Sequence, residues 1–103
     1  MANLFKNYTL SCTDTSETTA YTVPGATTAV VIGCNVANTT ASSITADIKV
    51  AGKFLVKAVP LPAGAGLSVL DGKIILEATD TITVTSSSSG GNLDVIVSVL
   101  EQT

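Results

Sequence analysis

The last quarter of the chain constrains the fold most, because its apolar residues recur at the period of a β-strand. The stretch from Leu93 to Leu100 reads LDVIVSVL, and four of its apolar residues alternate onto one face of an extended chain. The opposite face carries Asp94 and Ser98, but also Ile96 and Leu100. A strand with apolar residues on both faces is covered on both sides. We expect a second sheet to cover one face and another copy or a partner protein to cover the other.

The rest of the chain repeats this alternation in short segments between turn residues. Expected strands cover 4–12, 19–23, 27–37, 44–50, 54–59, 67–70, 73–77 and 81–85, followed by the last strand. Two antiparallel hairpins are predicted, one joining 27–37 to 44–50 and one joining 67–70 to 73–77 through Asp71-Gly72. The segment from Pro60 to Gly66 contains two prolines and two glycines and predicts a crossover between sheets.

This spacing of strands predicts an all-β fold. We expect residues 1–103 to form a single β-sandwich of jelly-roll-like character with about eight antiparallel strands. The alternative is an up-and-down barrel, and the crossover at 60–66 favours the sandwich because a meander needs only tight hairpins.

Composition excludes several classes of partner. Charged residues make up only 13% of the chain, and 16 Thr and 10 Ser supply most of its polarity. The net charge is −3, and all five basic residues are Lys. A nucleic-acid reader needs a basic stripe with Arg, so we expect no nucleic-acid binding. The longest apolar run, from Ala29 to Cys34, is too short to span a membrane, which takes about 20 residues.

Catalytic chemistry also lacks its usual residues. The chain contains no His, the usual base of a nucleophilic triad. Four carboxylates could pair for glycoside hydrolysis, but pairs arise by chance in a small domain; they are Glu17, Glu77, Asp80 and Asp94. Cys12 and Cys34 lie in apolar strand patterns, so buried free thiols are expected, with a disulfide as the alternative. We therefore predict no catalytic, cofactor or metal site.

Two long segments carry a family resemblance. They are AYTVPGATTAVVIGCNVANTT, from Ala20 to Thr40, and FLVKAVPLPAGAGLSVLDGKIILEATDTITVTSSSSGGNLDVIVSVLE, which ends at Glu101. Both resemble small virion structural proteins of tailed bacteriophages, which share a Y-T-x-P edge turn, a P-x-P-A-G crossover and a closing K-x-x-L-E-x-G-D-x-I-x-V-x-S pattern. The chain departs from that pattern at Thr79, where the family commonly has Gly before Asp80.

The resemblance implies a non-enzymatic structural protein of a phage particle, located in the virion after assembly in the host cytoplasm. The leading role is a head decoration or cement protein bound to the major capsid protein lattice. The alternative is a neck, collar or tail ring component. A second alternative is a small receptor- or glycan-binding module on a fibre, although two Tyr, two Phe and no Trp give little aromatic platform.

The expected contact surface lies on the outer face of the last strand and its neighbours. Its candidates are Ile96, Leu100, Ile75, Val31 and Leu61. Exposed together, such residues would form an apolar patch that soluble monomers rarely keep, so we expect a homo-oligomer or a virion partner. The alternative is that the segment 60–66 or the N-terminal arm folds over this face.

Overall fold

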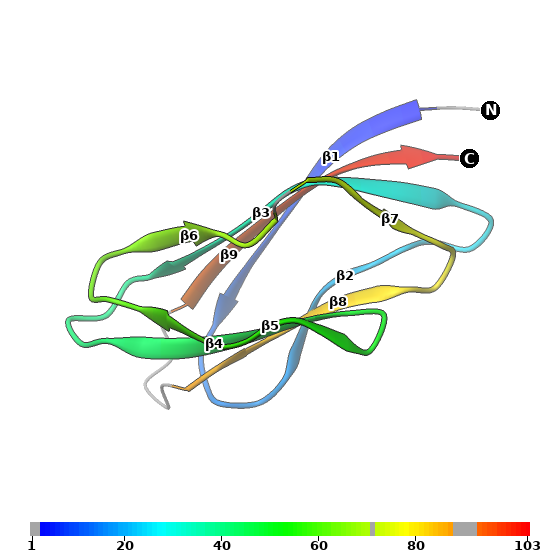
Figure 1. Cartoon of the computed structure of the whole chain (residues 1–103). Coiled ribbons are helices and arrows are strands. Elements are labelled where there is room, and N and C mark those ends of the chain that lie inside the picture. Colours follow the sequence, from blue (N-terminus) through cyan, green and yellow to red (C-terminus); the bar gives the residue numbers. More distant parts are fainter. Residues whose placement is uncertain (1–2, 71, 88–92) are drawn as a thin grey trace.

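The computed structural model describes residues 3–70, 72–87 and 93–103 and folds them into two antiparallel sheets packed face to face (Figure 1). The all-β sandwich predicted from the sequence is confirmed, and the described ranges contain no helix, so none that could cross a membrane. The strands are β1 (Asn3–Cys12), β2 (Thr18–Thr22), β3 (Thr28–Asn38), β4 (Ile44–Val50), β5 (Lys53–Leu61), β6 (Gly66–Ser68), β7 (Ile74–Leu76), β8 (Thr81–Ser86) and β9 (Leu93–Gln102).

The strand order is that of a jelly roll. The five-stranded sheet runs β1-β9-β3-β6, with β7 also paired to β3, and the four-stranded sheet runs β2-β8-β4-β5. Both β6 and β7 lie antiparallel along the same edge of β3, at 35–37 and 29–31, so they form one interrupted edge strand. Counted in this way the described part of the chain has eight strands, and the chain crosses between the sheets at most connections.

Both hairpins predicted between neighbouring segments, 27–37 with 44–50 and 67–70 with 73–77, are wrong. β3 and β4 lie in different sheets, so the loop at 39–43 crosses the sandwich. In the described residues β6 and β7 pair with β3 and not with each other, although Asp71 of the expected turn lies outside those residues. Both edges of β3 are occupied by strands distant in the sequence, β9 on one side and the two short strands β6 and β7 on the other.

A buried asparagine, Asn38 at the end of β3, is hydrogen-bonded to both loops that cross between the sheets there. The Nδ2 of Asn38 donates to the carbonyl oxygens of Ser42 (2.8 Å), Leu61 (3.0 Å) and Pro62 (3.2 Å). Its Oδ1 accepts from the backbone N of Thr40 (2.8 Å) and from its hydroxyl (2.7 Å). One side chain therefore satisfies backbone groups of both the 39–43 loop and the predicted 60–66 crossover, which is confirmed.

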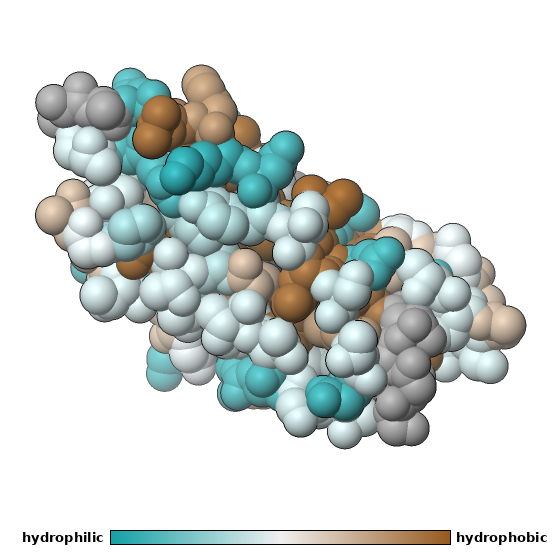
Figure 2. Space-filling view, turned by 180° about the vertical axis from the view of Figure 1, so that it is seen from behind, coloured by the Kyte–Doolittle hydropathy of each residue, from teal (hydrophilic) through white to brown (hydrophobic). Residues whose placement is uncertain are grey.

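The core lies between the sheets and follows the predicted alternation. In β9 the odd-numbered residues are buried, and in β8 Ile82 and Val84 are buried between threonines. Cys12 and Cys34 are free and buried, as predicted. The surface has few strongly hydrophilic side chains. In the view of Figure 2 most residues are pale, and apolar side chains gather in patches near the middle and at the upper left.

The turn from Glu77 to Asp80 contains Thr79, which stands where the phage proteins that the sequence resembles commonly have Gly. The backbone N of Asp80 donates to the carbonyl of Glu77 (3.1 Å), and Thr79 between them has a φ of 71°. Its backbone N still donates to the carbonyl of Val23 (3.0 Å). A positive φ at the third position of a turn favours Gly, and a β-branched residue is strained there.

We expect Thr79→Gly to raise the free energy of unfolding by about 1 kcal/mol. It removes the Cβ clash of the left-handed conformation and keeps the backbone N–H, which outweighs the greater freedom of Gly in the unfolded chain. Urea unfolding followed by circular dichroism measures the change. Ala78→Gly, one residue earlier without a positive φ, should lower stability instead. A loss of stability in Thr79→Gly would contradict the strain at this turn.

Candidate functional site

An apolar row crosses the outer face of the five-stranded sheet. Phe5 of β1 lies opposite Leu100 of β9, Leu100 lies opposite Val30 of β3, and Val30 lies opposite Ile75 of β7. Phe5 and Ile75 at the two ends of the row are 75% and 69% exposed, and the two inner residues are half-buried. Side chains on directly opposite residues are in contact distance, so the row is a continuous apolar stripe over four strands.

Two further isoleucines widen this stripe. Ile32 of β3 is 44% exposed and Ile96 of β9 is 47% exposed. We call the set the apolar outer face; its members are Phe5, Val30, Ile32, Ile75, Ile96 and Leu100. Such a concentration on one face of a small chain marks a surface for contact with another molecule.

The opposite face of the molecule is polar. The outer side of the four-stranded sheet carries Thr83 and Lys49 on opposing residues, with Glu17 bound to both. Among the described residues, this side exposes one large apolar side chain, Phe54. The ammonium groups of Lys49 and Lys57 lie over its ring, 4.9 Å and 4.6 Å from the ring centroid. This face is therefore suited to water, and the exposed apolar side chains are concentrated on the other sheet.

Two shallow hollows lie along the β1–β9 ladder on that face. One holds about 200 Å³ and is bordered by Phe5, Ile32 and Ser98; the other holds about 270 Å³ and is bordered by Thr9–Ser11 and Asp94–Ile96. Between them the hydroxyl of Ser98 donates to Asn7 Oδ1 (2.8 Å). The hollows are shallow recesses in a sheet face, a shape that fits protruding side chains of a protein partner.

The sequence-predicted candidates divide into two groups. Ile96, Leu100 and Ile75 lie on the apolar outer face. Val31 and Leu61 do not: both are 1% exposed and pack in the core, so their assignment to a contact surface is wrong.

A bulge in β3 causes the first error. The register of β3 against β9 shifts between Val31 and Gly33, so Val31 and Cys34 both point inward and Val30 points outward. A glycine inside a strand is the usual sign of a bulge, so Gly33 was the available signal. Leu61 points inward because it pairs with buried Ile44 at the end of β5.

Within residues 3–70, 72–87 and 93–103, neither predicted cover lies over this face. β1 extends the sheet beside β9 instead of folding over it, and the 60–66 segment leads into β6 on the β3 edge. Sequence reasoning missed Phe5, Val30 and Ile32 as members of the face. The alternation of β1 put Phe5 on the outer side, but it could not show that β1 pairs with β9.

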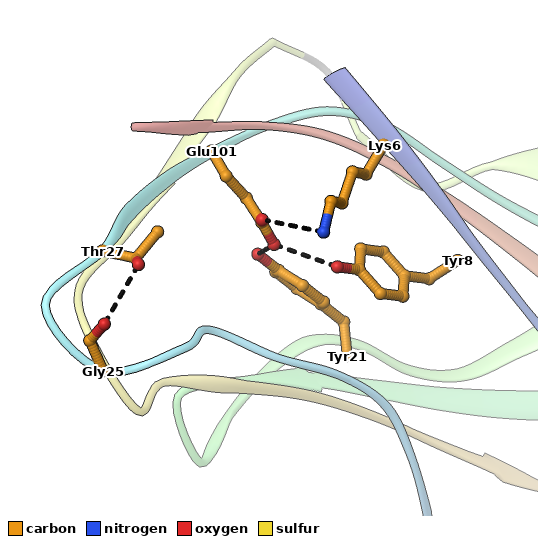
Figure 3. A network of polar contacts seen from close by, with 6 residues as sticks. All are labelled: Lys6, Tyr8, Tyr21, Gly25, Thr27 and Glu101. Atoms are coloured by element: carbon orange, nitrogen blue, oxygen red, sulfur yellow. Dashed lines mark hydrogen bonds and ion pairs between the residues drawn. The ribbon is translucent and has the colours of Figure 1, made fainter. Parts of the chain in front are cut away.

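A second, buried group of polar residues lies between the sheets (Figure 3). The carboxylate of Glu101 in β9 is 4% exposed, and its Oε2 accepts from the hydroxyls of Tyr21 in β2 (2.6 Å) and Tyr8 in β1 (3.0 Å). Lys6 Nζ lies 3.7 Å from Oε1. The two tyrosine rings pack with centroids 4.6 Å apart. The carboxylate thus ties three strands of both sheets together.

Hydrogen bonding keeps this carboxylate ionised. The hydroxyl of Tyr21 lowers the pKa of Glu101, burial opposes this, and the hydroxyl of Tyr8 and the charge of Lys6 lower it further. Burial and the hydrogen bond to Glu101 raise the pKa of both tyrosines. Glu101 and the tyrosines line neither of the two hollows, whereas Lys6 borders the hollow of about 200 Å³.

Metal-binding clusters are also missing from the described ranges, where no three His, Cys, Asp or Glu side chains converge. Burial raises the pKa of Cys34 to about 11 and contributes most to the raised pKa of Cys12. Both thiols are therefore protonated near neutral pH and poorly reactive.

Comparison with known proteins identifies a shared fold. No protein-family model and no curated protein sequence matches the chain. Among solved structures, a chain from the disulfide-linked pili of Bacillus endospore appendages superposes with a TM-score of 0.57 at 12% identity, over 98% of this chain and 88% of that one. A family 35 carbohydrate-binding module from Clostridium thermocellum covers 97% and 98% at 11% identity, with a TM-score of 0.42 that supports no inference. The chain therefore shares its all-β fold with a pilus chain.

The Glu101 cluster predicts a specific acid sensitivity. The pKa of the Glu101 carboxyl lies below its ordinary value of 4.5. The contribution of Glu101 to the free energy of unfolding is therefore complete above pH 4.5 and is lost as the pH falls through the lower pKa of the folded state. We expect Glu101→Gln to cost about 1–3 kcal/mol of unfolding free energy near neutral pH and to flatten the loss of stability at acid pH. Exposed Glu77→Gln should keep the wild-type profile. Parallel pH profiles of urea unfolding for Glu101→Gln and wild type would show that the ionised Glu101 carboxylate does not stabilise the fold.

Proposed function

We propose that the protein is a non-enzymatic structural subunit that is held in a larger assembly by its apolar outer face. The observation that carries this proposal is the exposed stripe from Phe5 to Ile75 on one sheet, opposite a polar face on the other. Burying each large apolar side chain contributes about 1.5–3 kcal/mol. Several such contacts per subunit, repeated by symmetry, stabilise an assembly even where one contact is weak.

A non-enzymatic role fits the internal chemistry. The chain contains no His, and the strongest polar cluster in the described residues is sealed between the sheets. Its carboxylate is buried and already bound by two tyrosine hydroxyls and a lysine, an arrangement that suits a structural contact better than proton transfer to a substrate.

The assembly that we propose is a tailed-phage particle, and the support for it is the sequence resemblance between Ala20 and Glu101. The leading role is a head decoration protein seated on the major capsid lattice, with a neck, collar or tail ring component as the alternative. A glycan-binding role has less support because Phe5 and Phe54 lie on opposite faces and both tyrosines point into the sandwich. They provide no shared aromatic platform.

Copy number distinguishes the two virion roles. Band quantitation of purified particles against the major capsid protein should give hundreds of copies for a decoration protein. A small multiple of six or twelve would place the protein at the neck or tail. Absence from the particle would overturn the virion role altogether.

A pair of substitutions that introduces charge tests the apolar outer face directly. We expect Ile32→Asp with Ile75→Asp to fold as the wild type does but to be depleted from particles about tenfold or more, because two carboxylates would be buried without partners. The matched control is Thr19→Asp with Phe54→Asp, which adds the same charge to exposed positions on the outer side of the four-stranded sheet. Circular dichroism verifies folding, and immunoblots of purified particles measure incorporation. Equal incorporation of both variants would show that this face is no interface.

A further inference from the structure

The edge of β1 is open in the described part of the chain. β1 pairs with β9 on one side, through ten residue pairs from Asn3–Gln102 to Cys12–Leu93 without a register shift, and no described strand pairs with its other side. Backbone N–H and C=O groups along such an edge are free to pair with another strand.

The other edges of the two sheets are protected, whereas β1 is not. β2 is only five residues long and has a register shift, and β6 and β7 have three residues each. β5 has two shifts, a positive φ at Ala58 and a proline at Pro60. β1 contains neither Pro nor Gly, and its one charged side chain, Lys6, is paired with Glu101. Lys6 is therefore the one feature of β1 that could oppose strand addition, and its charge is offset by Glu101; the strand has no proline, glycine or register shift.

The exposed groups of β1 point to what covers it. Phe5 on the outer side is 75% exposed, and Leu4 on the inner side is 48% exposed. A few residues along the same strand, Thr9 to Ser11 border the hollow of about 270 Å³ on the outer face. A protruding ring and a recess thus lie on one strand and on one face, as a self-complementary two-fold contact requires.

We propose that β1 pairs antiparallel with β1 of a second copy, about a two-fold axis at Asn7. Opposite residues in an antiparallel pair project to the same face, so Phe5 of each copy then lies beside Thr9 of the other and enters its hollow. On the inner side Leu4 lies beside Leu10, and Lys6 lies beside Tyr8 and not beside its own symmetry mate. The two five-stranded sheets become one continuous sheet. This pairing goes beyond the proposed virion role and does not depend on it.

Cysteine cross-linking tests both the edge and the register. At the proposed axis the two Asn7 residues are directly opposite, about 4.5–5.5 Å apart between Cα atoms, within the range of a disulfide. Two Thr9 residues would be separated by four positions along the strands, roughly 13 Å, which is beyond that range. Asn7→Cys should therefore form a disulfide-linked dimer under mild oxidation at least about tenfold faster than Thr9→Cys. Wild type should give none, because Cys12 and Cys34 are buried.

Light scattering supplies a second measurement that needs no cysteine. Wild type should show a concentration-dependent shift from monomer to dimer mass, and Phe5→Ala should raise the dissociation constant about tenfold or more. Equal cross-linking rates for Asn7→Cys and Thr9→Cys would overturn the proposal, as would a monomer mass at every accessible concentration. The Ile32 and Ile75 substitutions lie on β3 and β7 and leave the backbone edge of β1 unchanged, so their particle incorporation and the cross-linking of Asn7→Cys report separately on the proposed function and on the pairing.

Discussion

The pairing of β9 between β1 and β3 is the constraint on which the rest of the structure depends. It joins the last strand of the chain to the first along ten residues and to the longest strand along most of its length. The alternation of β9 then sends one set of side chains into the core and the other onto the outer face. The same strand thus determines both the packing of the sandwich and the composition of its contact surface.

Glu101 shows how closely these two roles are linked. It occupies an inward position of β9, where a carboxylate is unfavourable unless it is fully hydrogen-bonded. Tyr8 and Tyr21 supply those bonds from strands of different sheets, so the polar group fixes the spacing of the layers at the end where the start of β1 lies beside the end of β9 (Figure 1). The adjacent outward residue, Leu100, lies in the centre of the apolar stripe.

The sequence allowed the strands to be predicted but not all of their partners. Local alternation is a property of each strand, so the segments, the core face of β9 and the 60–66 crossover were found. Pairing depends on contacts between distant residues: the loop bonded by Asn38 leads from β3 into the other sheet, and β6 and β7 pair with β3 and not with each other. The outward position of Ile96 follows from alternation in β9, whereas the position of Val31 was reversed by the bulge at Gly33.

The two sheets differ in the features that limit association with other chains, namely polar outer faces and interrupted edge strands. The four-stranded sheet has a polar outer side, covers Phe54 with two lysines, and interrupts its edges with bulges and a proline. The five-stranded sheet leaves Phe5 and Ile75 exposed and keeps β1 regular and unblocked. Natural sheets that remain monomeric protect such faces and edges. The low charge and high Thr content of the chain agree with the proposed structural subunit, which would have one sheet face toward water and one toward its neighbours.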